Sequence, residues 1–488
     1  MKLCELIKNI PGASIFPEGA DIDIQKIVID DRAITPNSLF VCLRGGSVDG
    51  HNFAQSAVKN GAVAIVTERF IPKIKTAQVV VGDTRSALSY LSASFFGEPQ
   101  KKLKIIGVVG TNGKTSVSHI TAHLLNSASK KAAVIGTLGA KCGQDYMSTD
   151  LTTPDPFMLF SLLDKFVKAG ASYVVMEVSA HAISLKKVAA IDFEVLIFTN
   201  CTHDHLDYFT DFSGYRQVKK SIFSGQSRFF VVNTDDVLGR EIYSSAPHKS
   251  VTYALNAPSD VFAINLKESQ EGLSFVLNMF DMVYKTKTRL LGEFNVSNCL
   301  AAACAAFLCG VKPFDIAKAV QTIAPVSGRL EKIATVRGAN VFLDYAHTPD
   351  GLDKSLSFVS ATCVRDTYCV FGCGGNRDKQ KRPIMGRIAG DIADFVVVTS
   401  DNPRDEKPES IIRDIEVGIR SVSLDYITII DRKSAIEYAL ERLECGDSLL
   451  IAGKGAEEYQ EVKGERLAFS DRQVVLDYLS GLEKTNNE

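Results

Sequence analysis

The feature that most constrains this chain is an apolar run that leads through a short glycine-bearing loop into a helical pattern. Residues 104–109 form the run, residues 110–113 form the loop, and Lys114-Thr115-Ser116 begin the helical pattern. Such a loop turns backbone N–H groups toward an anion, and the start of the following helix adds its positive dipole end. We therefore expect a strand–loop–helix unit that binds phosphate groups.

The side chains around this loop predict the kind of phosphate ligand. Lys114 is expected to reach the outer phosphates of a nucleotide, and Thr115 is expected to ligate Mg²⁺. The full motif has glycine where this chain has Val108, so the loop is a shorter variant, and short Gly-Lys-Thr strings also occur by chance. Apolar residues at helical spacing over 117–124 indicate the helix that the motif requires. The sequence therefore predicts the use of ATP.

The length of 488 residues exceeds what a single core supports and suggests about three domains. Residues 1–100 contain short β-type runs, and the polar stretch 97–102 is typical of a linker. Residues 101–328 and 329–488 each alternate apolar strand candidates with helical patterns, which predicts parallel sheets covered by helices. We expect an α/β fold with a smaller N-terminal α/β domain, a central P-loop-type ATPase domain and a C-terminal Rossmann-like domain.

The charge balance and the cysteines limit the classes of partner. The formal net charge is −2, and no apolar run approaches the roughly 20 residues that cross a bilayer. We therefore expect no nucleic-acid or membrane partner, and the start of the chain lacks the apolar segment of a secretory signal. Eleven cysteines without Cys-x-x-Cys pairs predict reduced, mostly buried thiols in a cytoplasmic protein. We expect no metal at Cys369 and Cys373.

Polar and charged residues directly follow several strand candidates. Open parallel sheets bind ligands at the carboxyl ends of their strands, so we expect these residues to line one cleft between the central and C-terminal domains. The residues placed in this way are Glu177, 199–205, 344–347, 374–377, 401–404 and 453–455. The strand candidates are 27–29, 39–41, 64–66, 105–109, 173–176, 195–198, 229–232, 341–343, 368–371, 395–398 and 449–451, and an alanine-rich helix is expected at 296–309.

Single residues in these segments have more than one explanation. Glu177, a carboxylate at a strand end near the phosphate loop, ligates Mg²⁺ or else caps a helix or forms a salt bridge. His205 belongs to a cluster of two histidines and two aspartates, and it is either a second metal ligand or part of a solvated turn. Residue type alone places Lys219 on a solvent-exposed helix face, and capping explains Asn295 and Asn298 as well as ligand binding does.

Taken in order, the motifs of this chain resemble the Mur ligase family along essentially the whole length, and within that family the MurE type. Enzymes of that type add meso-diaminopimelate to UDP-N-acetylmuramoyl-L-alanyl-D-glutamate. The ATP loop, Glu177 and the Asp-Tyr-Ala-His string mark the superfamily, which includes folate polyglutamating ligases, whereas Asp-Asn-Pro-Arg is tied to diaminopimelate rather than lysine. The strings that carry the resemblance are Asp30-Asp31-Arg32, Asp49-Gly50-His51, 110–115, Thr152-Thr153-Pro154, Glu177-Val178-Ser179, 204–207, Gly328-Arg329-Leu330-Glu331, 344–349, 374–378 and Asp401-Asn402-Pro403-Arg404.

The resemblance implies that the N-terminal domain binds the UDP end of the substrate and the C-terminal domain binds the incoming amino acid. Implied ATP contacts are Gly110, Thr111, Asn112, Gly113, Lys114, Thr115, Ser116, Asn298, Arg329 and Asp344. Implied contacts with the UDP substrate are Ile29, Asp31, Gly46, Ser47, Val48, Thr152, Thr153, Ser179, Leu185 and Lys187. Implied contacts with diaminopimelate are Arg377, Asp401, Asn402, Pro403, Arg404, Gly453 and Glu457, and implied Mg²⁺ ligands are Thr115, Glu177, His205 and Lys219.

The resemblance reverses the interpretation of Lys219, which matches a lysine that the family carries as a carbamate. CO₂ adds to the neutral amine and converts a cation into a carboxylate-like anion that can ligate Mg²⁺. Burial favours the neutral amine that this reaction needs. The resemblance thus implies that Lys219 is catalytic, together with Lys114, Glu177 and His205.

Four residues depart from the family pattern. Asp31 places an anion where the family usually has serine, near the UDP end, and Ala180 removes one hydroxyl from the Glu-Val-Ser-Ser string. Leu185 replaces a polar amide, so one substrate contact is expected to be lost. Ala456 replaces the histidine of Gly-Lys-Gly-His-Glu, so the amino-acid pocket is expected to differ in shape.

The implied reaction is amide formation through an acyl phosphate, in which positioning and charge stabilisation matter more than a nucleophile. Arg377 and Arg404 would pair with the carboxylates of diaminopimelate. Lysine would leave one buried guanidinium unpaired, which supports discrimination on the order of 10⁴-fold. Closure of two domains would exclude water, and a monomer is expected. A folate polyglutamating ligase and a nucleotide-dependent switch are the alternatives, although a domain before the ATP loop suits a nucleotide-sugar substrate.

Overall fold

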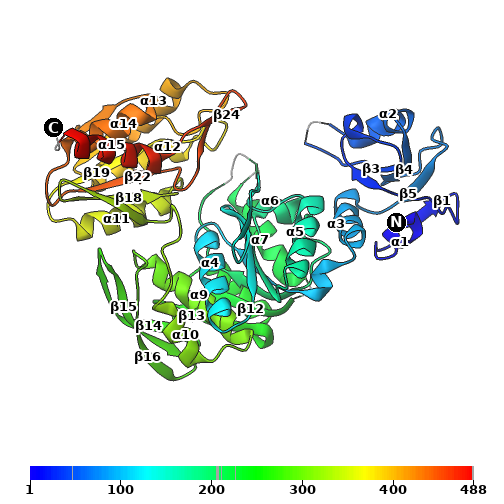
Figure 1. Cartoon of the computed structure of the whole chain (residues 1–488), viewed down its shortest axis with the longest axis horizontal. Coiled ribbons are helices and arrows are strands. Elements are labelled where there is room, and N and C mark those ends of the chain that lie inside the picture. Colours follow the sequence, from blue (N-terminus) through cyan, green and yellow to red (C-terminus); the bar gives the residue numbers. More distant parts are fainter. Residues whose placement is uncertain (47, 205–207, 210, 226, 486–488) are drawn as a thin grey trace. The chain divides into compact units, whose positions relative to one another are not determined.

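The computed structural model of the chain describes residues 1–46, 48–204, 208–209, 211–225 and 227–485 (Figure 1). It divides into two compact units. The first unit consists of Met1–Val109, Ser129–Ile197 and Val218–Phe230. The second unit consists of Gly110–Ala128, Phe198–Gln217 and Val231–Glu488.

The first unit begins with a five-stranded sheet in the order β1-β5-β4-β3-β2, in which all neighbours are parallel except β1 and β5. Helix α3 begins where the Asp83 side chain accepts from the N–H groups of Arg85 and Ser86, which is a common N-cap arrangement. Leucine, isoleucine and valine side chains fill the core between this sheet and helices α1 and α3. The elements are α1 (Leu3–Ile7), β1 (Ser14–Phe16), β2 (Lys26–Val28), η1 (Asp31–Ala33), β3 (Ser38–Val41), η2 (Gly50–Phe53), α2 (Ala54–Lys59), β4 (Ala62–Thr67), β5 (Ala77–Val80) and α3 (Thr84–Phe95).

The polar stretch 97–102, which the sequence predicts to be a linker, forms an ordered turn. Glu98 has a φ of 54°, and Pro99–Lys102 form a 3₁₀ helix (η3) in which Pro99 and Gln100 are buried. Proline suits the first position of such a helix, because an N–H at that position would have no acceptor within the helix.

Parallel strands form the centre of the second sheet in the first unit. The strands β6 (Lys104–Val109), β10 (Tyr173–Glu177) and β7 (Ala132–Gly136) pair in that order, and β11 (Phe193–Phe198) lies on the other side of β6. These strands are nearly continuous apolar runs, which is typical of a sheet with both faces covered. The predicted parallel pairing is thus confirmed at the centre, and antiparallel strands extend the sheet beyond β7. Further elements are β8 (Gly139–Cys142), β9 (Asp145–Met147), α5 (Pro156–Lys168), α6 (Ala180–Ser184), α7 (Phe212–Ser221), which begins in the second unit, and η4 (Ile222–Ser224).

In the second unit, helix α4 (Lys114–Ser127) contacts helix α9 (Phe294–Leu308), which confirms the expected alanine-rich helix within two residues. Sequence analysis missed an antiparallel meander, β14-β15-β16, because long polar side chains interrupt its alternating pattern. The elements are β12 (Ser227–Asn233), which begins in the first unit, α8 (Val237–Ser245), η5 (Pro247–Lys249), β13 (Ser250–Ala254), β14 (Val261–Ser269), β15 (Gly272–Met279), β16 (Met282–Thr288) and α10 (Pro313–Val320).

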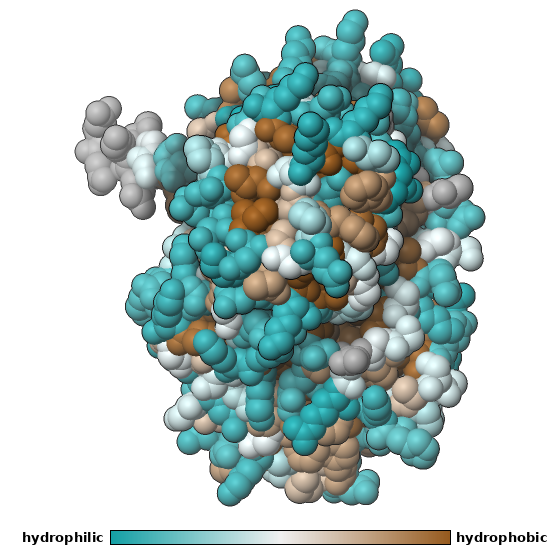
Figure 2. Space-filling model, turned by 90° about the vertical axis from the view of Figure 1, so that its right-hand side faces the viewer, coloured by the Kyte–Doolittle hydropathy of each residue, from teal (hydrophilic) through white to brown (hydrophobic). Residues whose placement is uncertain are grey.

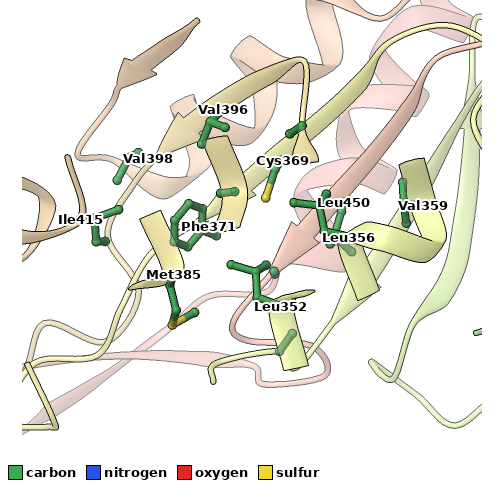
Figure 3. Packing of buried hydrophobic residues seen from close by; sticks show 14 of the residues in the cluster. Leu352, Leu356, Val359, Cys369, Phe371, Met385, Val396, Val398, Ile415 and Leu450 are labelled. Atoms are coloured by element: carbon green, nitrogen blue, oxygen red, sulfur yellow. The ribbon is translucent and has the colours of Figure 1, made fainter. Parts of the chain in front are cut away.

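The C-terminal part of the second unit is a six-stranded sheet in the order β17-β18-β22-β19-β20-β21, parallel except for β17. Helices α11, α12 and α13 cover one face, and α14 and α15 cover the other. On the first face, Val398 of the sheet lies close to Ile415 of α13, and Phe371 lies close to Met385 of α12 (Figure 3). The elements are β17 (Glu331–Val336), β18 (Ala339–Asp344), α11 (Pro349–Thr362), β19 (Thr367–Phe371), α12 (Lys381–Ile392), β20 (Phe395–Val398), α13 (Pro408–Ile419), β21 (Tyr426–Thr428), α14 (Arg432–Arg442), β22 (Ser448–Ala452), β23 (Tyr459–Val462), β24 (Glu465–Ala468) and α15 (Asp471–Thr485).

Most of the cysteines are buried. All eleven cysteines are free thiols, and burial raises the pKa of the Cys299, Cys369 and Cys373 thiols to about 12. Cys373 lies in the core beside Met385, with the two sulfur atoms 3.8 Å apart. On the face shown in Figure 2, apolar side chains lie in small patches among polar ones. No helix in the described ranges combines the length and the apolar character needed to cross a membrane.

Candidate functional site

The phosphate loop, residues 110–113, ends at the N-terminus of helix α4. Gly113 is the N-cap residue and has a φ of +84°. A Cβ atom at Gly113 would lie 2.6 Å from Oδ1 of Asn298, so glycine allows both the left-handed backbone and the close approach. Because glycine has no side chain, no N-cap side chain competes with an anion for the first N–H groups of α4.

The segment after β11 holds the phosphate loop in place. The N–H of Thr111 donates to the carbonyl oxygen of Asn200 at 2.9 Å, and the N–H of Asn112 donates to Oδ1 of Asn200 at 2.9 Å. In return, Oγ1 of Thr199 donates to the carbonyl oxygen of Asn112 at 2.7 Å. Asn200 and Thr199 lie in a segment that the sequence marked only as polar and following a strand, so their role was missed.

Lys114 folds back over the phosphate loop. Its Nζ donates to the carbonyl oxygens of Gly110 at 2.9 Å and Thr111 at 2.8 Å. A Cβ atom at Gly110 would lie 1.8 Å from Oγ1 of Thr199, so glycine is also required at the start of the loop. The side chain thus places a cation directly above the loop, where a phosphate would bind.

Residues from 329 to 350 also contact the phosphate loop within the second unit. Nη2 of Arg329 donates to Oγ1 of Thr115 at 2.9 Å, and the Arg329 guanidinium lies 4.2 Å from the centre of the Tyr345 ring. Nδ2 of Asn112 donates to Oδ2 of Asp350 at 2.7 Å. The structure therefore brings the predicted Arg329 to the predicted Thr115 and to Tyr345 of the predicted segment 344–347, and it adds Asp350, which sequence analysis missed.

Neither asparagine at the start of α9 caps that helix. Residue Glu293 is the N-cap, and no side chain forms a capping hydrogen bond there. Nδ2 of Asn295 donates to the carbonyl oxygen of Leu291 at 2.7 Å, and Nδ2 of Asn298 donates to Oδ1 of Asn295 at 2.8 Å. The capping explanation is therefore wrong, and Oδ1 of Asn298 instead lies next to Gly113.

Asp344 is the last residue of β18 and is buried. Its carboxylate accepts from Oγ of Ser355 at 2.5 Å and from the N–H of Ala346 at 3.0 Å. Burial raises the pKa of the Asp344 carboxyl, while the Ser355 bond and the Arg329 charge act in the opposite direction. The carbonyl oxygen of Asp344 accepts from the N–H of Gly453 at 3.0 Å, so this residue touches a second set of predicted site residues.

In the first unit, Glu177 ends β10 as a buried carboxylate that is 1% exposed. It accepts from the N–H of Thr137 at 2.8 Å and from Oγ1 of Thr137 at 3.2 Å. A Cβ atom at Gly136 would lie 2.1 Å from Oε1 of Glu177. Across the part of the chain that is described, no ion pair or helix cap involves Glu177, so those alternative explanations are wrong.

The predicted substrate residues of the first unit gather beside Glu177. Oγ1 of Thr153 donates to the Glu177 carbonyl oxygen at 2.9 Å and accepts from the N–H of Ser179 at 3.0 Å. Oγ1 of Thr152 lies 3.0 Å from Oγ1 of Thr137. Lys187 is buried, with Nζ 2.8 Å from the Asp155 carboxylate and 3.3 Å from the Thr153 carbonyl oxygen. Leu185 follows α6 as its C-cap residue and is half-buried.

The predicted residues of the N-terminal sheet lie just after two neighbouring parallel strands. Ile29 follows β2 and is 50% exposed, and Asp31 begins the short helix η1. Gly46 and Val48 follow β3, and Val48 is 52% exposed, with its carbonyl oxygen accepting from the N–H of Gly45. Ser47 lies outside the described residues.

The predicted metal ligands have different outcomes. Lys219 is completely buried in α7, so the prediction of a solvent-exposed helix face is wrong. His205 lies outside the described residues, and its neighbour Asp204 is buried. Within the described ranges, no group of three or more His, Cys, Asp or Glu side chains could hold a metal ion. Threonine and a modified lysine, which are also assigned here as ligands, are not among these residue types.

The residues predicted to bind the amino acid gather at the carboxyl ends of β19, β20 and β22. A Cβ atom at Gly374 would lie 3.0 Å from Nη1 of Arg404 and 3.6 Å from Cγ of Arg377, so the two arginines flank one glycine. A Cβ atom at Gly375 would lie 1.9 Å from the carbonyl oxygen of Pro403. Together with two further residues, these form what we call the acceptor cluster: Arg377, Asp401, Asn402, Pro403, Arg404, Gly453, Lys454, Glu457 and Glu461.

Lys454 joins the buried members of the acceptor cluster. Its side chain is fully buried, and Nζ donates to Oδ1 of Asn402 at 2.9 Å and Oε2 of Glu457 at 3.1 Å. Nδ2 of Asn402 donates to the same Glu457 oxygen at 3.0 Å. Oδ1 of Asp401 is buried, lies 3.6 Å from Nζ of Lys454 and accepts no hydrogen bond in the described structure. An unsatisfied buried carboxylate oxygen of this kind is suited to an incoming amine.

Arg404 is already paired with a residue that sequence analysis missed. Nε of Arg404 donates to Oε2 of Glu461 at 2.9 Å, and Nη1 donates to the carbonyl oxygen of Gly375 at 2.8 Å. The side chains of Arg404 and Glu461 are 21% and 30% exposed. Glu461 lies on β23, far along the chain, and no motif marks it. Arg404 therefore has an anionic partner, Glu461, within the chain itself.

A buried ion pair lies behind the acceptor cluster. Arg432 donates to both carboxylate oxygens of Asp471, at 2.7 Å and 2.8 Å, and neither side chain is exposed. Nη2 of Arg432 also donates to the carbonyl oxygen of Ala452 at 2.9 Å, and Nη1 donates to that of Ser400 at 3.4 Å. This pair thus fastens the strand ends that carry Asp401 and Gly453.

Comparison with known proteins identifies similar sequences and folds. The models for the "Mur ligase family, catalytic domain", the "Mur ligase middle domain" and the "Mur ligase, glutamate ligase domain" match residues 23–96, 108–306 and 328–455. A UDP-N-acetylmuramoyl-L-alanyl-D-glutamate–2,6-diaminopimelate ligase of Geobacillus thermodenitrificans is 40% identical over 483 residues, which are 97% of this chain and 98% of the relative.

Two solved structures extend the comparison. A UDP-N-acetylmuramoyl-L-alanyl-D-glutamate–2,6-diaminopimelate ligase has a TM-score of 0.67 and 31% identity, covering 94% of this chain and 95% of that one. Mycobacterium tuberculosis folylpolyglutamate synthase, complexed with ADP and AMPPCP, has a TM-score of 0.64 and 18% identity. It covers 76% of this chain and 92% of its own, and shows a shared fold alone. The three matched regions confirm the predicted three-domain α/β architecture.

Proposed function

This chain belongs to the Mur ligase family, and we propose that it joins meso-diaminopimelate to UDP-N-acetylmuramoyl-L-alanyl-D-glutamate at the expense of ATP, a step in peptidoglycan precursor synthesis. The names of full-length relatives support this activity. One structural observation carries it: within one unit, Arg329 bonds Thr115 at the phosphate loop, and Asp344 bonds Gly453 of the acceptor cluster. A nucleotide and an amino acid can therefore be held by the same short segment.

The first step would transfer the γ-phosphoryl group of ATP to the γ-carboxylate of the D-glutamyl residue, forming an acyl phosphate and ADP. The open N–H groups of α4, Lys114 and Arg329 would stabilise the charge that develops on the phosphoryl oxygens. The amine of diaminopimelate would then attack the carbonyl carbon, and phosphate would leave with the electrons of its C–O bond. Closure of the domains would keep the acyl phosphate from water.

The donors present suit Mg²⁺. Glu177 is a buried carboxylate whose described hydrogen-bond donors are neutral, and such a charge is stabilised by a nearby cation. We assign Thr115, Glu177 and a carbamate on Lys219 as oxygen ligands, with His205 as a further ligand. When bound, Mg²⁺ would neutralise phosphate charge. The full burial of Lys219 supports the neutral amine that CO₂ requires, with one proton released as the N–C bond forms.

The remaining predicted residues would bind the two substrates. Asp401 and Glu457 would accept hydrogen bonds from amines of diaminopimelate, and Arg377 and Arg404 would pair with its carboxylates. Thr152, Thr153, Ser179 and Lys187 would contact the muramoyl dipeptide. Ile29, Asp31 and residues 46–48 would contact the UDP end, and Leu185 would contribute only an apolar contact. We further propose a monomer that works in the cytoplasm without nucleic-acid or membrane partners.

The direct test is phosphate release with purified protein, ATP, Mg²⁺, UDP-N-acetylmuramoyl-L-alanyl-D-glutamate and meso-diaminopimelate. We expect release that requires every component, with the tripeptide product identified by mass spectrometry. Release with lysine but not with diaminopimelate would overturn the acceptor assignment. Release with a folate and glutamate, but with neither of those acceptors, would favour the polyglutamating alternative. ATP binding without any release would favour a nucleotide-dependent switch.

A further inference from the structure

The pairing of Arg404 bears on how strictly the acceptor is selected. A guanidinium has three nitrogens, and two of those of Arg404 have partners: Nε bonds Glu461 and Nη1 bonds the Gly375 carbonyl oxygen. In the described structure, no hydrogen bond involves Nη2. An acceptor carboxylate that reaches Arg404 would therefore share the guanidinium with an existing anion.

The backbone keeps Glu461 beside Arg404. The N–H of Arg404 donates to the carbonyl oxygen of Glu461 at 3.0 Å, and the N–H of Lys463 donates to that of Arg404 at 2.8 Å. The N–H of Glu461 donates to Oδ1 of Asn402 at 2.9 Å. Arg404 itself has a φ of +51°, a left-handed conformation that these bonds hold in place. Backbone bonds to the β23–β24 hairpin thus hold Arg404 beside Glu461, so the pair does not depend on the side-chain conformations alone.

We propose that Glu461 determines acceptor specificity by neutralising part of the charge of Arg404; this rests on the proposed function of the acceptor cluster. Strong rejection of an acceptor without the second carboxylate requires a site group that is left unpaired. Glu461 removes that penalty, because Arg404 keeps an anionic partner when lysine binds. Glu461 also repels the second carboxylate of diaminopimelate, since two like charges would share one cation. Both effects narrow the preference for diaminopimelate over lysine.

Substitution of Glu461 by glutamine separates charge from position. Glutamine keeps an oxygen that can accept from Nε of Arg404, so the guanidinium stays in place while the negative charge is lost. We expect Glu461→Gln to lower the KM for meso-diaminopimelate by about threefold to tenfold, the range for a half-buried charge pair. The KM values for ATP and the UDP substrate are expected to stay unchanged. The ratio of kcat/KM for diaminopimelate over lysine is expected to rise, and the rise should shrink in high salt.

Glu465→Gln is the matched control, because Glu465 lies on the same hairpin, is exposed and pairs with Val462 through the backbone. It should leave all constants unchanged. Glu461→Ala removes the charge and the hydrogen bond together. Its comparison with Glu461→Gln therefore tests whether the hydrogen bond holds the Arg404 guanidinium in position. A raised or unchanged KM for diaminopimelate in Glu461→Gln, with wild-type turnover intact, would overturn the specificity role alone. Absence of diaminopimelate turnover in the wild-type protein would overturn the proposed function and this inference with it.

Discussion

The phosphate loop and the acceptor cluster lie in the same unit, but different forces hold them. Neutral hydrogen bonds from Thr199 and Asn200 and two close-packed glycines fix the phosphate loop. The acceptor cluster depends on charged side chains, with Lys454 buried among three oxygen-bearing residues and Arg432 paired with Asp471 behind it. Removing one partner of a buried ion pair leaves an uncompensated charge and strongly lowers the stability of the fold. Neutral hydrogen bonds to the backbone carry no such charge. Substitutions should therefore harm the two regions in different ways.

The largest expected effect is on stability behind the acceptor cluster. Arg432→Ala would leave the Asp471 carboxylate buried and unpaired, and we expect the free energy of unfolding to fall by about 3–5 kcal/mol. Urea denaturation followed by circular dichroism measures this change. Arg387→Ala breaks an exposed pair with Asp391 and should cost less than about 1 kcal/mol. Equal losses in the two variants would refute the claim that buried charges hold this region.

The next largest effect is on activity at the phosphate loop. Lys114→Ala removes the cation above the loop while the Thr199 and Asn200 bonds remain, so we expect kcat/KM to fall by about 10²–10³-fold. Phosphate release measures the rate, and the unfolding midpoint should change little. Lys102→Ala, at an exposed position in η3, serves as the control. The proposed division between the regions would be contradicted if Lys114→Ala lowered the unfolding midpoint while the folded fraction kept the wild-type kcat/KM.

A smaller effect separates backbone strain from close packing. Gly113 and Gly170 both have positive φ, but a Cβ at Gly170 meets nothing within 4 Å. We expect Gly170→Ala to cost about 1 kcal/mol from strain and Gly113→Ala to cost more, about 2–3 kcal/mol, with loss of activity. Thermal unfolding and phosphate release measure the two effects. Asn298→Ala in the Gly113→Ala background should recover part of the stability; no recovery would mean that Asn298 is not the neighbour that matters.

The smallest effect concerns how the stability contributed by Glu406, beside the loop that carries Arg377, depends on pH. The Arg382 guanidinium lowers the pKa of the Glu406 carboxyl from 4.5 to about 2, helped by the N–H of Asn376. A lowered carboxyl pKa contributes stability above pH 4.5 that is lost as the pH falls toward 2. The stability difference between wild type and Glu406→Gln should therefore shrink across that interval. Glu409→Gln, exposed on α13, should follow the wild type; a constant difference for Glu406→Gln would refute the linkage.

Local patterns in the sequence predict the phosphate loop well but the acceptor cluster only in part. Gly110, Gly113 and Lys114 are neighbours in the chain, so one motif brings strand, loop and helix together. The strand ends that carry Asp401 and Gly453 were also predicted, since apolar runs mark β20 and β22. Glu461 was missed because its partner lies 57 residues away and because β23 is a strand of four residues with no apolar run to mark it.

Burial of polar side chains was the harder property to predict. Residue type favours exposure for Lys219, yet it is completely buried, and only the family resemblance suggested otherwise. Lys454 is also fully buried, although residue type favours exposure for lysine. No local pattern in its glycine-rich string indicates this burial. Which charged groups are buried depends on contacts between distant segments, and spacing along the chain does not record those contacts.

The pairing of β18 with β22 has a consequence for how this enzyme family diversifies. Asp344 and Ala452 face each other at the strand ends, and we propose that the loop after each serves a different substrate. On these proposed roles, changes in the loop after β22 or in the hairpin beyond it would alter which amino acid is accepted and would leave the nucleotide-binding segment unchanged. Acceptor specificity could then change in evolution through a few substitutions near the C-terminus, while the residues proposed to bind the phosphates stay the same.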